Sequence, residues 1–132
     1  MTMRAPWDAI VWWEIRRIPF NLAIGLVGFA TSLTIVGVGD LLVKPGEDFV
    51  EPMLLIVGGV VYGLAANAFY TLGWVSELLW TRGDTSKTAA IRSRIFWLGL
   101  SASAGLTLLP AGAVVVLWAL SGFPVTPPNA SG

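Results

Sequence analysis

The sequence contains no cysteine and no histidine, and only 12% of its 132 residues are charged. The first two absences exclude disulfides, thiol nucleophiles, zinc sites built from cysteine and histidine, and histidine-ligated haem. Charge is scarce as well, since soluble domains carry it on about a quarter of their residues. The formal net charge is zero, so the overall balance favours no acidic partner. We therefore expect no metal, no cofactor and no nucleic-acid partner.

Long apolar runs are what the sequence has instead. Hydrophobic residues make up 55% of the chain, and the mean hydropathy is +0.75. Three runs, at about 18–43, 52–80 and 95–120, each exceed the roughly 20 residues that cross the hydrocarbon core as a helix. We predict an all-α, polytopic membrane protein in which three transmembrane helices form one domain over 18–120.

The segments that flank this domain are expected to differ from it. Residues 1–17 combine tryptophans with arginines, which is typical of a short helix lying at the membrane interface. The alternative is that this segment simply begins the first span. The tail, 121–132, is rich in proline and small residues and is expected to be disordered. Within the third run, Pro110 is expected to kink the helix.

Basic residues are distributed unevenly around the predicted spans. Lys44 alone lies in the connection between the first and second runs. The other seven of the eight basic residues precede the first run or lie between the second and third: Arg4, Arg16, Arg17, Arg82, Lys87, Arg92 and Arg94. Because basic residues stay on the cytoplasmic side, we predict a cytoplasmic N-terminus and a C-terminus outside. Size and topology suggest a multipass protein of a bacterial inner membrane.

Each predicted span has one face of small or polar residues. Helices in lipid associate through close packing, which small side chains permit. We predict that these faces form the helix contacts, and that Gly59 and Gly63, a GxxxG pair, pack within the bundle rather than between copies. The packing residues are Gly25, Gly28 and Ser32 in the first span, Gly59 and Gly63 in the second, and Ser101 and Gly105 in the third.

A second group of residues is polar or aromatic and should gather at one end of the bundle. Ionisable and amide groups near lipid are costly unless partnered, which makes them candidates for a functional site. We expect Glu77 to pair with Arg17 or Arg16. Two interpretations stay open: a site for a ligand, an ion or a lipid headgroup, and a structural set of anchors and helix-joining bonds. The candidate cluster comprises Glu14, Arg17, Asn21, Asn67, Tyr70, Trp74 and Glu77.

Two stretches around this cluster, WWEIRRIPFNLAIG and ANAFYTLGWVSE, resemble small multipass bacterial membrane proteins of no assigned function. Those proteins similarly have a Trp-Glu, Arg and Phe/Tyr-Asn run ahead of the first span. They also have an Asn-x-x-Tyr-x-x-Gly-aromatic element in a later span, which corresponds here to Asn67, Tyr70, Gly73 and Trp74. The resemblance covers a small part of the chain and implies no activity.

Three functions are compatible with these features. The first is a non-enzymatic membrane protein that acts through helix contacts, by self-assembly or as the accessory subunit of a membrane protein partner. The second is an oligomeric channel or transporter subunit, in which polar side chains would line a narrow pore: Asn21, Thr31, Ser32, Thr34 and Asn67. The third, an enzyme that acts on lipids with Glu14 or Glu77 as acid or base, has no supporting motif. We therefore predict that the protein is not an enzyme.

The orientation can be tested with reporters fused to the C-terminus. A reporter that is active only outside the cytoplasm should be active, because an odd number of spans separates the two termini. A reporter that is active only in the cytoplasm should be silent, and activity from it would contradict the predicted orientation.

Overall fold

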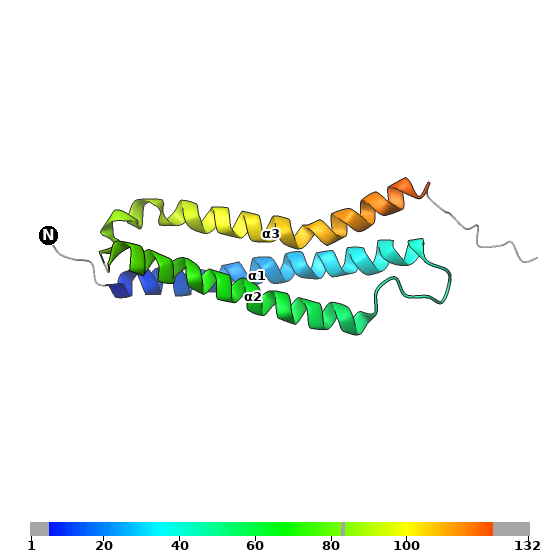
Figure 1. Cartoon of the computed structure of the whole chain (residues 1–132), viewed down its shortest axis with the longest axis horizontal. Helices are drawn as coiled ribbons and strands as arrows, with labels where there is room; N and C mark the ends of the chain where they lie inside the picture. Colours follow the sequence, from blue (N-terminus) through cyan, green and yellow to red (C-terminus); the bar gives the residue numbers. More distant parts are fainter. Residues whose placement is uncertain (1–5, 83, 123–132) are drawn as a thin grey trace, which may run out of the picture.

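Three long helices make up almost all of the computed structural model, which describes residues 6–82 and 84–122 (Figure 1). The helices are α1 (Pro6–Gly39), α2 (Pro52–Thr81) and α3 (Ala89–Leu120), and two short 3-10 helices lie in the connections, η1 (Asp40–Leu42) and η2 (Thr85–Lys87). All three long helices are long and apolar enough to cross a membrane. The all-α architecture with three candidate spans is thus confirmed.

The first helix is continuous and longer than the sequence suggests. A separate short interfacial helix within 1–17 is not found in the described part of that segment, because α1 runs unbroken from Pro6. Pro19 removes only the N–H that would bond the carbonyl of Ile15, and the helix continues through it. Buried residues keep one face on both sides of this proline, with Trp13 before it and Phe20 after it. The same contact surface therefore extends along the whole helix.

The central position belongs to α1, which packs mainly against α3 and less extensively against α2. In Figure 1, α2 approaches α1 near its C-terminal end and diverges from it toward Pro52. Along α2 only Tyr70 is buried among the described residues, whereas α1 and α3 each bury several. The second helix is consequently the least covered of the three.

A polar junction joins the three helices near the middle of their length. The hydroxyl of Thr31 on α1 donates to the carbonyl of Thr107 on α3, at 3.0 Å. The hydroxyl of Tyr62 on α2 lies 2.8 Å from that of Thr107 and donates to the carbonyl of Ser103, at 3.1 Å. Side-chain hydrogen bonds of this kind hold helices together in lipid, where water offers no alternative partner.

The third helix bends in its second half (Figure 1). Pro110 lies inside α3 and cannot donate to the carbonyl of Leu106 one turn earlier. A proline is among the usual causes of such a bend, which agrees with the kink expected from the sequence. The tail predicted for 121–132 is described only at Ser121 and Gly122, and the remaining residues lie outside the described part.

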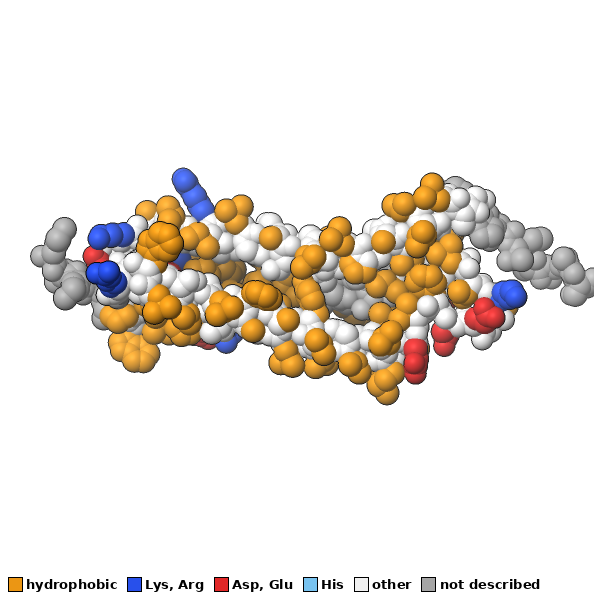
Figure 2. Space-filling model, in the orientation of Figure 1, with side chains coloured by type: hydrophobic (Ala, Val, Ile, Leu, Met, Phe, Trp, Pro, Cys, Tyr) orange, Lys and Arg blue, Asp and Glu red, His pale blue; other side chains and the backbone are white. Residues whose placement is uncertain are grey.

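The two ends of the bundle differ in charge, as Figure 2 shows. We call the end where α1 begins, α2 ends and α3 begins the basic end; its cations are Arg16, Arg17, Arg82, Lys87, Arg92 and Arg94. We call the opposite end the acidic end; its anions are Asp40, Glu47, Asp48 and Glu51. In the turn at the basic end, Asp84 accepts bonds from the hydroxyl and N–H of Ser86, which hold its pKa below the usual value.

The middle junction gives a stability test. Thr107→Val keeps the shape of the side chain but removes a hydroxyl that bonds another helix, so it should lower the free energy of unfolding by about 1 kcal/mol. The matched control is Thr34→Val, because that hydroxyl bonds only Ala30 of its own helix. Unfolding measured in bicelles should separate the two variants. Equal effects would mean that the Tyr62–Thr107 contact adds no stability.

Candidate functional site

The carboxylate of Glu77 receives hydrogen bonds from α1, from α3 and from the residue that precedes α3. The indole N–H of Trp13 donates to Oε2 at 2.6 Å. The guanidinium of Arg92 donates through Nε, at 2.9 and 3.1 Å from the two carboxylate oxygens, and through Nη2, at 2.6 Å from Oε1. The hydroxyl of Thr88 also donates to Oε1. The three long helices are therefore joined at one anion near the basic end.

This ion pair is buried: the side chains of Glu77 and Arg92 are each only 8% exposed. The chain brings the two together through the short turn between α2 and α3. Arg82 there adopts a left-handed conformation that ends α2, and Thr85 is buried beneath the turn. Thr88 precedes Arg92 by four residues, so both side chains lie on the same face of the helix start.

The geometry of Glu77 determines which chemistry is open to it. Moving a charged group from water into the protein interior costs roughly several kcal/mol. This cost is offset only where opposite charge and hydrogen bonds satisfy the group. Here Trp13, Thr88 and Arg92 already donate to the two carboxylate oxygens. One of these hydrogen bonds would have to break before the carboxylate could accept a proton from a substrate. A general base needs a free lone pair within reach of its substrate. The arrangement therefore suits a structural role, in which the carboxylate joins the three helices, better than acid or base chemistry.

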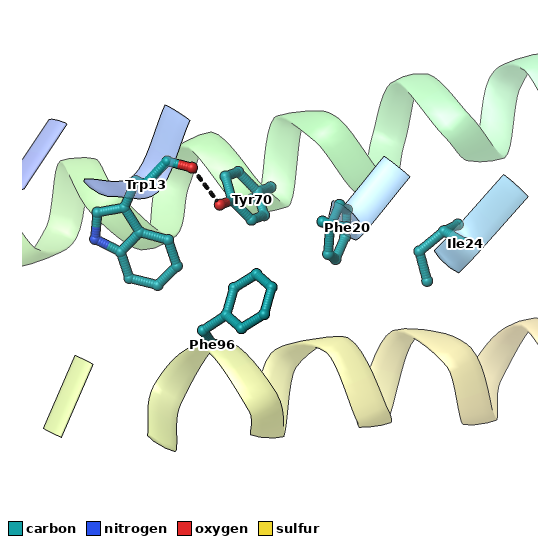
Figure 3. Close-up of a cluster of buried hydrophobic side chains, with 5 residues drawn as sticks. All are labelled: Trp13, Phe20, Ile24, Tyr70 and Phe96. Carbon is teal, nitrogen blue, oxygen red and sulfur yellow. Dashed lines mark hydrogen bonds between the residues drawn. The ribbon is translucent and has the colours of Figure 1, made fainter. Parts of the chain in front are cut away.

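An aromatic cluster lies next to the hydrogen bonds of Glu77 and shares Trp13 with them (Figure 3). The hydroxyl of Tyr70 donates to the backbone carbonyl of Trp13 at 2.6 Å. Its ring lies edge-on to the indole of Trp13, with centroids 5.5 Å apart, and 4.8 Å from the ring of Phe20. Phe96 adds a ring from α3, 6.5 Å from Trp13. Aromatic pairs in these arrangements contribute about 0.5–1.5 kcal/mol beyond area burial.

About two turns beyond Trp13 on α1, Asn21 forms a reciprocal amide pair with Asn67 of α2. Asn67 donates to Oδ1 of Asn21 at 2.8 Å, and Asn21 donates back at 3.2 Å. The second N–H of Asn67 bonds the carbonyl of Gly63 on its own helix. Asn21 makes no second bond of this kind among the described residues, and its side chain is exposed. The predicted approach of these two residues is therefore observed.

The arginine partner predicted for Glu77 was wrong. Arg17 pairs instead with Glu14 one turn away, at 3.0 Å, and donates to the hydroxyl of Thr71, at 2.9 Å. Arg16 lies over the ring of Trp12, 3.8 Å from its centroid. Local partners on α1 thus occupy both arginines before they reach Glu77. One signal for the true partner is present in the sequence: Arg92 precedes the apolar Phe96 by four residues, so the two side chains share one helix face.

Trp74 lies at the edge of this site rather than at its centre. Its indole nitrogen is buried without a hydrogen-bond partner, as is Nε of Arg17. The ring packs against the aromatic cluster. Of the seven candidate residues, Tyr70 and Glu77 are joined through Trp13, Asn21 pairs with Asn67, and Glu14 pairs with Arg17. Trp13, Thr88 and Arg92 complete the site, and sequence reasoning did not include them in it.

Most of the small residues predicted to form close helix contacts do not form them within the chain. A Cβ added at Gly25, Gly59, Gly63 or Gly105 would meet nothing within 4 Å, and one at Gly28 would only touch Thr107. Ser101 is exposed on α3. The contacts that do form use larger side chains, because aromatic rings and threonines span the gaps between helices.

Glycines of α1 and α2 instead face one another across a groove of about 390 Å³. Gly25, Gly28 and Ser32 line one wall and Gly59 and Gly63 the other, and the amide pair of Asn21 and Asn67 closes the groove toward the basic end. Another hollow, of about 460 Å³, opens between α2 and α3 beside Glu77; Trp80 and Ile95 are among its mainly apolar lining residues.

Comparisons with protein-family models, with curated proteins and with solved structures found no match to this chain. Its function must therefore be inferred from its own geometry. Among the described residues, no group of three or more acidic side chains is arranged to hold a metal ion.

The energetic coupling between Glu77 and Arg92 can be measured by a double-mutant cycle. Glu77→Met or Arg92→Met alone leaves a buried charge without its counterion and should cost about 3–5 kcal/mol of stability. The double variant should cost much less than the two together, because both charges leave. Glu14→Gln is the control, since that carboxylate is 42% exposed and its pair with Arg17 should contribute less than about 1 kcal/mol. Strictly additive single effects in bicelles would show that Glu77 and Arg92 are not coupled.

Proposed function

We propose that this chain is a small integral membrane protein that acts through contacts between membrane-spanning helices. It either assembles with itself or serves as an accessory subunit of a larger membrane protein, and it is not an enzyme. The main support is the incomplete coverage of α2. Toward the basic end, Asn67, Tyr70 and Glu77 are bonded to other helices, whereas the stretch from Pro52 to Val61 is almost entirely exposed.

The alternative is an oligomeric channel or transporter subunit. Three of the side chains considered for a pore lining are bound elsewhere: Thr31 bonds α3, and Thr34 and Ser32 bond carbonyls of α1 itself. Asn21 alone keeps an exposed amide. Pores for ions are usually lined by charged side chains or rings of carbonyls. The geometry therefore supports helix contacts more than a conduction pathway.

We further propose a bacterial inner membrane as the location, with the N-terminus in the cytoplasm. The separation of the basic end from the acidic end, on opposite sides of the three candidate spans, supports this orientation (Figure 2). The small multipass bacterial proteins that the sequence resembles fit the same location.

Photocrosslinking in intact membranes tests the proposed function. A photoreactive residue placed singly at lipid-facing positions on each helix, Leu26, Val60 and Leu98, should form a protein adduct at one or more of them. The purified protein in liposomes should not increase ion flux above that of empty liposomes. Flux that scales with protein content, or lipid adducts alone at every position, would contradict the proposal.

A further inference from the structure

The groove between α1 and α2 is an opening that the chain itself leaves empty. Its walls are two helix faces that are already bonded to each other nearer the basic end, through Asn21 and Asn67 and through Arg17 and Thr71. The same two faces separate toward the acidic end, where the groove of about 390 Å³ begins. It is thus the continuation of an existing helix contact.

Two features of this groove suit the approach of another helix. First, a Cβ built at Gly25, Gly59 or Gly63 meets open space, so the backbone of both walls is accessible. Close approach of backbones is what drives helix association in lipid. Second, Asn21 lines the groove, and only one of its two amide N–H groups is bonded among the described residues. The second N–H favours a polar or backbone partner, because an unpaired donor is costly where water is excluded.

The occupant must match the charge and shape of the walls. No charged residue occurs in 18–39 or in 52–76, so the partner must be uncharged over the same depth. A second α2 meets this condition. Ile56 and Val60 form an exposed ridge at the rim of the groove, immediately beside Gly59 and Gly63. Ridge and groove on one surface make it self-complementary, as a twofold contact requires.

We propose that a second copy of this chain docks on this surface, so that the Ile56–Val60 ridge of each copy enters the α1–α2 groove of the other. Copies inserted in one membrane share one orientation, so the two α2 helices run parallel, as in dimers of the GxxxG type. The inference rests on the proposed function and names its partner. It replaces the packing within the bundle expected for Gly59 and Gly63.

Disulfide trapping tests the contact directly, because the chain has no cysteine of its own. Val60→Cys places a thiol on the ridge that would meet the other copy, and should give a covalent dimer on mild oxidation in the membrane. Val61→Cys is the matched control: the two valines are equally exposed, at 59% and 60%, but only Val60 lines the groove. Failure of Val60→Cys to crosslink, or equal crosslinking of both, would overturn the proposal.

Glycine replacement provides an independent measurement. Gly59→Ile should weaken association by about ten-fold or more, because the added side chain keeps the backbones apart. Gly105→Ile, on the exposed face of α3, should leave association unchanged. Both added side chains point into open space, so both variants should keep the helical content of the parent. Unchanged association of Gly59→Ile would overturn the proposal.

The outcomes separate this inference from the function on which it rests. Photoadducts to another protein, without a Val60 disulfide, would overturn the second copy as occupant and leave the contact function standing. Lipid adducts alone at every position would contradict both.

Discussion

All three long helices meet at the buried carboxylate of Glu77. A carboxylate removed from water is stable only where donors surround it, and Trp13, Thr88 and Arg92 donate to this one. The requirement fixes the rotation of all three helices at once, because each must present its donor or acceptor to the same point. Aromatic rings then fill the adjacent space, and the hydroxyl of Tyr70 bonds the Trp13 carbonyl within it.

The contacts of α2 with the other helices become fewer with distance from this point. The amide pair of Asn21 and Asn67 lies further along, and Tyr62 provides the last side-chain hydrogen bond that α2 makes to another helix. From Pro52 to Val61 the second helix has no polar side chain at all, and its glycines cannot bridge a gap. Its divergence from α1 follows from that composition, since lipid competes equally well for its apolar side chains.

The sequence predicts the number and apolar character of the helices well, because these depend on local composition, but it begins the first and third spans later than the structure begins α1 and α3. It also places α2 at Pro52, where the structure begins it. It fails where the answer depends on how helices rotate: Arg92 rather than Arg17 reaches Glu77, because a local carboxylate captures Arg17. Small residues show where another helix can approach closely, but they do not show which helix does so. The glycine faces therefore did not predict the contacts within the chain.

The divergence of α2 has a mechanical consequence. The helix is bonded to its neighbours as far as Tyr62 and is uncovered from there to Pro52, which leaves a free end about 15 Å long at a rise of about 1.5 Å per residue. A change of about 5° in the tilt of this end would move Pro52 by about 1.3 Å. Helix tilt responds to the hydrocarbon thickness of the surrounding bilayer. A change in the tilt of α2 relative to α1 would therefore alter the width of the groove between them.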